Sequence, residues 1–345
     1  MPFHARWRHF SVGGVDRWAR LARHVADPFA RARAAYDLAI VSVLLDAGAG
    51  PAWRYREAGS NATLARSEGL AVASLDMFAR GTFSAQADDP LRVDAGALER
   101  LSDAQIAEGF QVSADNPLVG VAGRTQLLRS LGGAIRARPE IFGAAGRLGG
   151  LVDHLVAQAQ DGALPAVAIL QSVLAGLGPI WPARITLAGV NLGDVGRHPA
   201  ARTGDVTDGL VPFHKLSQWL TYSLIEPLEW MGLRVVDLDA LTGLPEYRNG
   251  GLFLDAGVLV AKHEGVTRDP HEANSELVVE WRALTVDLLD RLAAAMRDEL
   301  RMDAEQLPLA KMLEGGTWAA GRRIAAEKRS DGRPPITVIS DGTVF

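Results

Sequence analysis

The apolar residues of this chain repeat at helical spacing over most of its length. Between Phe29 and Leu44 they recur every three or four positions, and Asp27-Pro28 before them is typical of an N-cap followed by proline at the first helical position. The same period predicts helices at Leu70–Arg80, Ser102–Phe110, Gly149–Gln160, Pro165–Gly178 and Leu216–Met231. Strand patterns are few, and residues 336–340 are the clearest of them. The pattern therefore predicts a mainly α-helical fold with minor short strands.

Capping and turn signals indicate where these elements begin and end. Ser102 with Gln105 fits a capping box, and Asn116-Pro117 is a helix-start signal. Asp269-Pro270-His271-Glu272 predicts a helix that begins with Asp269 as its cap and continues to about Leu300. Inside the segment 216–231 we expect Pro227 to kink the helix or divide it. Tight turns are predicted at Gly59-Ser60-Asn61, Leu241–Pro245 and Gly250-Gly251.

Residues 211–255 place polar side chains beside a strongly apolar segment. His214-Lys215 stand where the helical pattern begins, and about thirty residues later a Gly/Pro turn carries Glu246, Tyr247, Arg248 and Asn249. Burying unpaired polar groups is costly, so a chain seldom combines so many of them with so much apolar surface unless they meet in a pocket. The stretch therefore predicts a binding site.

Length, charge and cysteine content narrow the classes of protein. The 345 residues suffice for a single globular domain, which we expect to consist of two interlocked lobes of about 1–200 and 201–345 with the pocket between them. A formal net charge of -5 argues against a broad basic face for nucleic acid. Cysteine is absent, which removes disulfides and thiolate chemistry and fits a reducing compartment. Without a signal-peptide pattern or a run of about 18 apolar residues, we expect a soluble cytoplasmic protein with no membrane partner.

The common cofactor and metal motifs are missing from the chain. It has no GxGxxG after a strand, no GxxxxGK[ST], no HExxH and no GxSxG elbow. The eight histidines are scattered, and none has the spacing of zinc ligands. We therefore expect neither a metal nor a cofactor.

Three long motifs resemble a known family: GSNATLARSEGLAVASLDMFARGTFS, VPFHKLSQWLTYSLIEPLEWMG and LTGLPEYRNGGLFLDAGVL. Together they resemble the uracil-catabolism family of the Urc/Urg type, long labelled as a domain of unknown function, over nearly the whole chain. The resemblance implies a part in a pathway that releases nitrogen from uracil through ribosylurea-like intermediates. In that family the segment PFHARWRHF usually follows more sequence, so we expect a further N-terminal helical portion.

The order of polar motifs is also similar to that of the queuosine-salvage nucleotide N-glycosidases, which are helical and related to DNA glycosylases. Those enzymes have a Lys after a Phe-containing dipeptide, then a helix, then an Asp-Tyr-Arg turn. Here Phe213-His214-Lys215 precedes Glu246-Tyr247-Arg248, with Glu in place of the Asp. Asn116-Pro117-Leu118 resembles their Pro-Leu segment, and Thr317-Trp318 resembles part of their C-terminus. The resemblance implies a DNA-glycosylase-like fold of the helix-hairpin-helix type.

This second resemblance implies hydrolysis of an N-ribosidic bond in a uracil-derived nucleoside or nucleotide, such as ribosylurea or its 5-phosphate. The transition state is oxocarbenium-like and needs a carboxylate near the anomeric carbon, a role that we expect of Glu246. We expect Lys215 to hold the substrate, to donate a proton or to pair with Glu246. A plain structural Lys–Glu pair is the alternative.

The other candidate residues would bind the substrate. Arg248 and Arg124 are the best anion ligands, although Arg124 equally fits a solvated helix arginine, and Arg322 and Arg323 better fit a solvated basic helix face. His214 either binds phosphate or satisfies a carbonyl. The set is completed by Tyr247, Asn249, Asn116, Trp219, which better fits the core, and Asp255, which also fits a cap.

Three other functions stay open on the sequence alone. The first is another pyrimidine-catabolic enzyme, an amidohydrolase or a ring-opening enzyme, against which the lack of metal-ligand spacing and of thiols counts. The second is a non-catalytic nucleotide-binding protein, which would tolerate the loss of Glu246. The third is a DNA glycosylase, which the acidic net charge disfavours.

Overall fold

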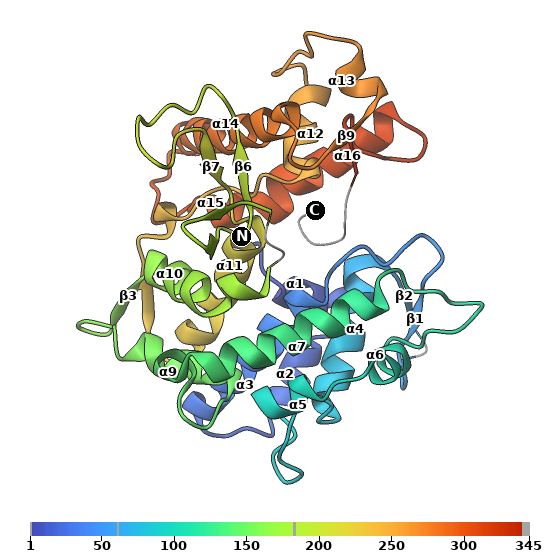
Figure 1. Ribbon diagram of the computed structural model, residues 1–345, viewed down its shortest axis with the longest axis vertical. Helices are drawn as coiled ribbons and strands as arrows, with labels where there is room; N and C mark the ends of the chain where they lie inside the picture. Colours follow the sequence, from blue (N-terminus) through green and yellow to red (C-terminus); the bar gives the residue numbers. More distant parts are fainter. Residues whose placement is uncertain (1, 61, 182–183, 340–345) are drawn as a thin grey trace. The chain divides into compact units, whose positions relative to one another are not determined.

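The computed structural model describes residues 2–60, 62–181 and 184–339. Within these ranges the fold is mainly α-helical, as predicted, and its strands form short two-stranded sheets (Figure 1). The chain divides into two compact units, of which unit 1 is Met1–His4, Pro182–Tyr222 and Asp237–Phe345, and unit 2 is Ala5–Trp181 and Ser223–Val236. The lobes of about 1–200 and 201–345, and a pocket between them, stay a prediction.

Unit 2 is a helical body with two small sheets. Its helices are α1 (Trp7–Phe10), α2 (Arg17–Ala22), α3 (Pro28–Leu44), α4 (Arg66–Ala79), α5 (Ala95–Glu99), α6 (Asp103–Gly109), α7 (Val121–Ala137), α8 (Pro139–Phe142), α9 (Leu151–Val156) and α10 (Ala166–Leu177). Strands β1 (Tyr55–Arg56) and β2 (Thr63–Leu64) pair antiparallel, and β3 (Ala163–Pro165) pairs parallel with β8 (Arg234–Val236). The core is centred on α3, whose residues from Ala34 to Leu44 are all buried.

Local signals set several helix starts in unit 2 as predicted. The Asp27 carboxylate accepts a hydrogen bond from the backbone N–H of Ala30 at 2.7 Å, and α3 begins at Pro28. Ser102 and Gln105 form the predicted capping box of α6. The turn at Gly59-Ser60-Asn61 joins β1 to β2, although Asn61 lies outside the described residues.

Pro227 lies inside α11 (Lys215–Trp230), which continues through it. Of the two outcomes predicted for Pro227, the division of the helix is therefore wrong, and the kink stays a prediction. Proline has no N–H to donate to the carbonyl four residues earlier, that of Ser223. The indole Nε1 of Trp7 donates to the Ser223 carbonyl instead, at 2.7 Å, and this bond is buried. A side chain from elsewhere in unit 2 thus replaces the hydrogen bond that the proline removes.

Unit 1 contains the remaining elements. They are β4 (Thr186–Leu187), β5 (Val190–Asn191), β6 (Val195–Arg197), β7 (Leu210–Pro212), the first half of α11, α12 (Tyr247–Asp255), α13 (Gly265–Arg268), β9 (Pro270–Glu272), α14 (Glu276–Leu300), α15 (Leu309–Met312), a π-helical segment (Leu313–Trp318), α16 (Ala319–Lys328) and β10 (Thr337–Ile339). The sheets are β4 with β5 and β6 with β7, both antiparallel, and β9 with β10, parallel.

The predicted helix start at Asp269-Pro270 is wrong. Residues 270–272 form strand β9, whose partner is the strand predicted near 336–340 and observed as β10. Helix α14 begins only at Glu276, where the Ser275 side chain accepts a hydrogen bond from Val278 N–H. The pairing of β9 with a strand far along the chain overrides the local Asp-Pro signal, while the predicted end at Leu300 is confirmed.

The predicted tight turn at Gly250-Gly251 is also wrong, because both glycines lie inside helix α12. A Cβ on Gly250 would lie 2.7 Å from side-chain atoms of both Trp281 and Thr285, and one on Gly251 would lie 2.9 Å from Pro335. The glycines therefore let neighbouring chain segments approach the helix backbone closely. Glu246 to Asn249 accordingly form the N-cap and the first turn of α12 rather than a turn between helices.

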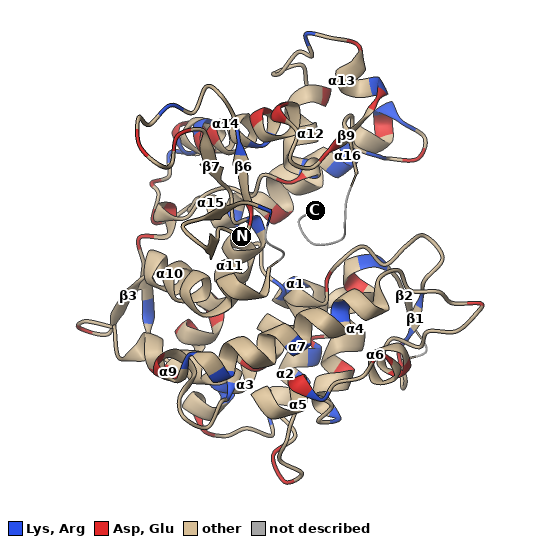
Figure 2. Cartoon of the chain, in the orientation of Figure 1, with Lys and Arg blue, Asp and Glu red and all other residues tan. Residues whose placement is uncertain are grey.

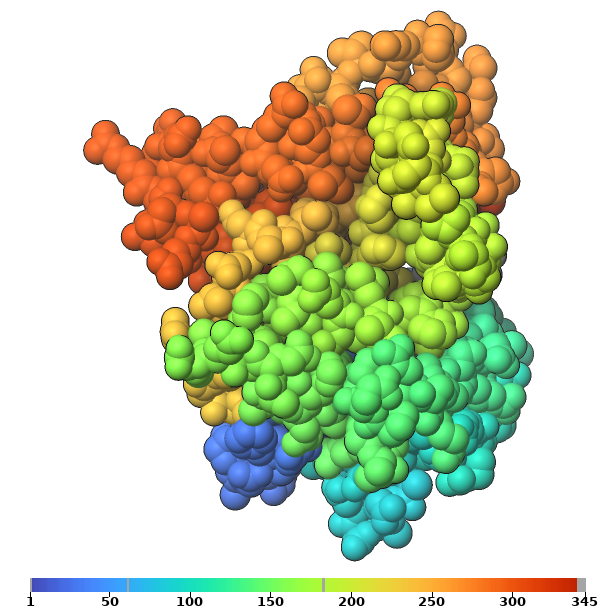
Figure 3. Space-filling view, turned by 60° about the vertical axis from the view of Figure 1, so that its left-hand side comes forward, coloured from blue at the N-terminus to red at the C-terminus, as the bar shows by residue number. Residues whose placement is uncertain are grey.

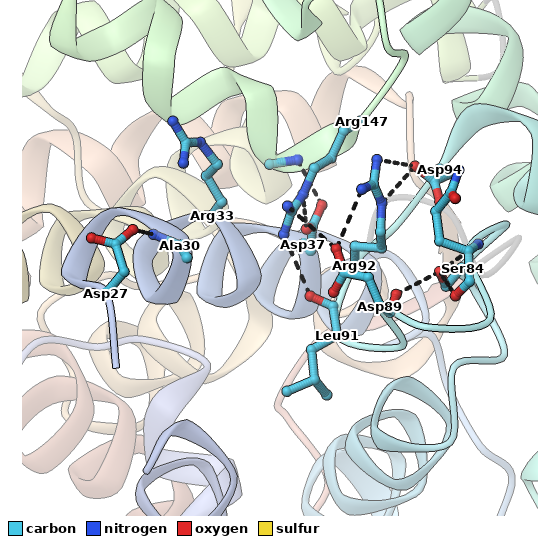
Figure 4. Close-up of polar contacts among 12 residues, drawn as sticks. Asp27, Ala30, Arg33, Asp37, Ser84, Asp89, Leu91, Arg92, Asp94 and Arg147 are labelled. Carbon is cyan, nitrogen blue, oxygen red and sulfur yellow. Dashed lines mark hydrogen bonds and ion pairs between the residues drawn. The ribbon is translucent and has the colours of Figure 1, made fainter. Parts of the chain in front are cut away.

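Unit 2 contains a buried carboxyl, Asp37, in a network of arginines and aspartates (Figure 4). Its oxygens accept hydrogen bonds from Arg147 Nε at 2.9 Å and from Gly149 N–H at 2.6 Å. Burial outweighs these contacts and raises the pKa of Asp37 to about 7. The network continues from Arg147 toward Asp89, which also pairs with Arg92.

Charges of both signs are distributed over the ribbon of each unit (Figure 2). Residues 202–207 of unit 1 are all exposed, and the yellow-green segment that holds them lies at the surface in Figure 3. No helix among the described residues has the length and apolarity to cross a membrane.

Gly250→Ala will destabilise the protein, by roughly 1–3 kcal/mol, because the added methyl group overlaps Trp281 and Thr285. Gly133→Ala is the matched control, since Gly133 is exposed within α7 and a Cβ there meets nothing within 4 Å. That change will stabilise the protein by roughly 0.5–1 kcal/mol through helix propensity. Urea denaturation of both variants measures the difference, and equal effects of the two would contradict the packing argument.

The pKa of Asp37 predicts a stability that falls as pH rises from about 4 to about 7. In this window the folded state holds the proton that the unfolded state releases, because the folded pKa lies above the ordinary value of 3.8. Asp37→Asn removes that titration, so its unfolding free energy will depend less steeply on pH than that of the wild type. Urea denaturation at pH 5, 6, 7 and 8 measures the two slopes.

Asp153→Asn is the control for this titration. Asp153 is half exposed, and hydrogen bonds from Arg33 hold its pKa below the ordinary value, outside the window. Its slope should therefore match that of the wild type. Parallel curves for wild type and Asp37→Asn would show that Asp37 keeps an ordinary pKa.

Candidate functional site

The start of helix α11 is held by a residue more than twenty positions earlier in the chain. The Asp194 carbonyl accepts hydrogen bonds from the N–H groups of Phe213 and His214, both at 3.0 Å. Its carboxylate accepts one from Lys215 N–H at 2.9 Å. The first amides of a helix have no partner within it, and Asp194 supplies that partner to the first residue of α11. The backbone of Lys215 is thereby fixed.

Arg282 of α14 pairs with Asp194 through two parallel hydrogen bonds, each 2.8 Å long. Its guanidinium lies over the ring of Phe213, 4.0 Å from the centroid, and its Nε donates to the Pro245 carbonyl at 3.3 Å. Burial raises the pKa of Asp194, but Arg282 outweighs it, so the pKa stays below the ordinary value. Arg282 thus connects the start of α11 to the residue before Glu246.

Glu246 is the N-cap of α12, and both its carboxylate oxygens are used. They accept hydrogen bonds from Arg248 N–H at 2.8 Å and Asn249 N–H at 2.6 Å. Only 9% of the residue is exposed. Burial raises the pKa of Glu246, while those two bonds and the charges of Lys215 and His4 oppose the rise. A carboxylate offers about four lone-pair sites, so acceptor capacity remains for a further donor.

Lys215 lies near two carboxylates, Asp194 with a lowered pKa and Glu246 with a raised one. Its charge lowers the pKa of both Glu246 and Asp194. Two of the predicted site residues, Lys215 and Glu246, are therefore within electrostatic reach of each other, although 31 positions separate them in the sequence. Their roles in chemistry stay predictions.

His214 adopts a left-handed backbone conformation, with a φ of 47°. Histidine visits this region more often than most residues, but the conformation still costs free energy that the surrounding contacts must supply. Burial lowers the pKa of His214, the charge of Asp194 opposes that effect, and the charge of Arg282 adds to it. The half-buried imidazole is therefore mainly neutral at pH 7.

Asn249 is fully buried and connects α12 to the π-helical segment. Its amide donates to the Leu244 carbonyl at 3.0 Å, and its Oδ1 accepts a hydrogen bond from Thr317 Oγ1 at 2.8 Å. A π-helical turn inserts one residue into a helix and is frequent at functional sites. Here the segment Leu313–Trp318 brings Thr317 to Asn249, whose N–H donates to the N-cap residue Glu246.

His4 joins the same group of residues from the first described stretch of the chain. Its Nδ1 lies 2.9 Å from a carboxylate oxygen of Glu314, and its backbone N–H donates to the Ala310 carbonyl at 2.9 Å. The imidazole lies beside the rings of Trp219 and Trp318, with 6.2 Å between centroids in each case. We call His4, Lys215, Glu246, Asn249, Glu314 and Thr317 the Glu246 cluster.

Of the other predicted residues of unit 1, some lie beside this cluster, whereas Asp255 pairs with a residue outside it. Tyr247 is 37% exposed, and the guanidinium of Arg248 lies 5.1 Å from its ring centroid. Arg248 also donates to the Gly332 carbonyl at 2.7 Å. Asp255, at the other end of α12, is buried and accepts two hydrogen bonds from Arg329. Trp219 contacts His4 as described.

Two predicted site residues belong to unit 2. Arg124 is buried, and its guanidinium donates to the carbonyls of Leu45, Ala47, Gly48 and Val119. Burial lowers its pKa to about 10. It is therefore not the solvated helix arginine that the pattern allowed, and its role as an anion ligand stays a prediction.

Asn116 does not start a helix, and its side chain is hydrogen-bonded to two other segments of unit 2. Its side chain accepts a hydrogen bond from Arg54 N–H and donates to the carbonyls of Arg54 and Gln111, all at 2.8 Å. Helix α7 begins at Val121, after Gly120 with a φ of 77°. The predicted helix start at Asn116-Pro117 is thus wrong, and a role for Asn116 in binding stays a prediction.

Sequence reasoning missed Asp194, Arg282, His4 and Glu314. Asp194 lies in a Gly-rich stretch that reads as a connection, and His4 lies among arginines and tryptophans with no spacing that marks a site. Arg282 follows Trp281 on the buried side of α14, and an arginine at a core position is the one signal that could have found it. Within the described ranges, no group of three or more His, Cys, Asp or Glu side chains could hold a metal ion.

Arg282→Ala will lower the free energy of unfolding by roughly 3–5 kcal/mol, because it leaves the Asp194 carboxylate, only 17% exposed, without its guanidinium partner. Arg291→Ala on the same helix is the matched control. Arg291 is exposed and forms a surface ion pair with Asp287, so its removal should cost no more than about 0.5 kcal/mol. Chemical denaturation of the two variants makes the comparison, and similar losses would show that the Asp194 pair adds no more than a surface ion pair.

Comparisons with known proteins place the chain in a family. A family model described as a protein of unknown function, DUF1688, matches residues 1–345. The chain is 43% identical to Protein urg3 of Schizosaccharomyces pombe, over all of this chain and 84% of that protein. It is 41% identical to Uracil catabolism protein 4 of Lachancea kluyveri, again over all of this chain and 85% of that protein. The chain belongs to the DUF1688 family.

Proposed function

We propose that this protein acts in uracil catabolism and hydrolyses an N-ribosidic bond in a uracil-derived nucleoside or nucleotide, such as ribosylurea or its 5-phosphate. The pathway is supported by a relative 41% identical to this chain that is named for uracil catabolism. The reaction is supported by the order of Lys215, a helix and Glu246, which resembles that of nucleotide N-glycosidases.

The observation that best supports the proposed reaction is the environment of the Glu246 carboxyl. Its carboxyl is buried, oriented by two backbone N–H groups and within reach of the Lys215 charge. Cleavage of a ribosidic bond develops positive charge at the anomeric carbon, and a fixed carboxylate stabilises that charge without reorganising. A raised pKa also suits a carboxylate that takes a proton from the attacking water.

Lys215 and its neighbours supply the rest of the proposed site. The ammonium of Lys215 opposes the rise that burial causes in the pKa of Glu246, and it holds substrate oxygens. Tyr247 and Arg248 lie in the first turn of α12, directly after Glu246, where an aromatic ring and a guanidinium can contact a base or ureido group and a phosphate. His214 and Asn249 complete the polar residues of the site.

We also infer that the helical fold is related to the helix-hairpin-helix fold of DNA glycosylases. In support, the two motifs that carry the resemblance each lie at the start of a helix in this chain. Lys215 is the first residue of α11, and Glu246 is the N-cap of α12. No cofactor enters the proposed reaction.

A non-catalytic nucleotide-binding protein is the second candidate. It is favoured by the use of both Glu246 oxygens as a helix cap, since this is a structural task that needs no chemistry. The two candidates differ in what Glu246→Gln does, because glutamine keeps the length of the side chain and one capping oxygen but loses the charge.

Purified protein incubated with ribosylurea, its 5-phosphate, uridine and UMP will release ribose or ribose 5-phosphate from at least one of them. Glu246→Gln will lower kcat/KM for that substrate by roughly 10²–10³, the usual cost of removing one electrostatic group from a site. A colorimetric assay of reducing sugar, with mass spectrometry of the leaving group, measures both.

Asp27→Asn serves as the matched control, because it changes a capping carboxylate of the exposed start of α3 in the same way. It should leave kcat/KM unchanged. Binding of one of the four compounds without release of sugar, by calorimetry, would instead favour the non-catalytic protein.

A further inference from the structure

Phe3 and His4 contact helix α15, which follows α14 in the chain. The Lys311 ammonium lies 5.2 Å from the ring centroid of Phe3, and His4 N–H is bonded to the Ala310 carbonyl. His4 is only 7% exposed. A histidine that is fixed by its backbone and buried in this way has little freedom to reorient.

Glu314 selects the tautomer of His4. A carboxylate only accepts hydrogen bonds, so the contact of 2.9 Å requires a proton on Nδ1. In the neutral ring Nε2 is then the unprotonated nitrogen, able to take and return a proton. A histidine oriented by a carboxylate is the usual arrangement of a general acid–base in enzymes.

His4 is also connected to Glu246 through defined contacts. The His4 ring lies beside Trp318, and Thr317 precedes Trp318 in the chain. The Thr317 hydroxyl donates to Asn249, and the N–H of Asn249 donates to Glu246. The π-helical segment supplies the Glu314, Thr317 and Trp318 side chains of this chain of contacts.

We propose that His4, oriented by Glu314, is the proton donor to the departing nitrogen. The proposal rests on the ribosidic hydrolysis proposed above. As the C–N bond breaks, its electron pair goes to the nitrogen, which takes the Nε2 proton of the His4 imidazolium. Water adds to the anomeric carbon and gives one proton to Glu246. Return of that proton from Glu246 to His4 restores the starting state.

The charged groups around His4 fit this cycle. Glu314 contacts His4 directly. The charges of His4 and of Lys215 both act on Glu246. Lys311 lies on the adjacent Phe3, and Arg322 lies over Trp318 at 4.9 Å. Both acidic and basic side chains therefore lie around the proposed donor.

The first test is a pH profile. With the substrate that the wild type cleaves, kcat/KM should be bell-shaped, falling at low pH as Glu246 is protonated and at high pH as His4 loses its proton. His4→Gln should lower kcat/KM by roughly 10²–10³ and abolish the fall at high pH. His24→Gln, at an exposed turn, is the matched control and should keep the full profile. A His4→Gln profile that keeps its high-pH limb would overturn the proposal.

The second test needs no activity and separates this inference from the proposed function. Two-dimensional NMR of ¹⁵N-histidine-labelled wild-type protein should show the neutral His4 ring protonated at Nδ1. Its titration midpoint should move to lower pH in Glu246→Gln. A ring protonated at Nε2, or a midpoint unmoved by Glu246→Gln, would refute the role of His4 even if sugar is released. Both NMR results as expected, with no sugar released from any of the four compounds, would instead refute the hydrolysis.

Discussion

The candidate site depends on one buried ion pair, that of Asp194 and Arg282. Removing two charges from water is expensive, and the cost is recovered only when each meets its partner in good geometry. Here the same carboxylate that pairs with Arg282 also caps α11, and the same guanidinium reaches the carbonyl of Pro245. The starts of α11 and α12 are therefore both tied to one pair of charges. A shift of either helix start would break a hydrogen bond to Asp194 or to Arg282.

This pair also explains why two carboxylates of unit 1 behave differently. Asp194 has a guanidinium in direct contact, and its pKa falls below the ordinary value in spite of burial. Glu246 accepts hydrogen bonds from two backbone N–H groups, and burial outweighs these bonds and the charges of Lys215 and His4, so its pKa rises. One carboxyl is thus committed to structure, whereas the other can change its protonation state. Environments that separate two carboxyls in this way are typical of acid–base chemistry.

The sequence predicted what is decided within a few residues. Asp27 and Ser102 cap their helices through bonds to residues three positions away, so the pattern of neighbours contains the whole interaction. Asp269-Pro270 shows the same kind of pattern, but strand pairing with residues 337–339 overrides it.

The candidate site follows the same division. Lys215 and Glu246 were predicted as site residues because long motifs surround them, and that role stays a prediction. Asp194 was not predicted, since its role depends on the ion pair with Arg282, 88 positions away. Gly250 was misread as a turn for the same reason, because what requires a glycine there is the side chain of Trp281.

The π-helical segment has a consequence for how this chain can vary in length. Each residue of a helix turns the chain by about 100°, so deleting one residue between Leu313 and Trp318 would rotate α16 by about that angle relative to α15. Gly321 of α16, where a Cβ would lie 2.2 Å from the Arg248 carbonyl, would no longer face α12. Substitutions in the segment leave this register intact, but an insertion or deletion does not. The length of this stretch is therefore under stronger physical constraint than the identity of most of its residues.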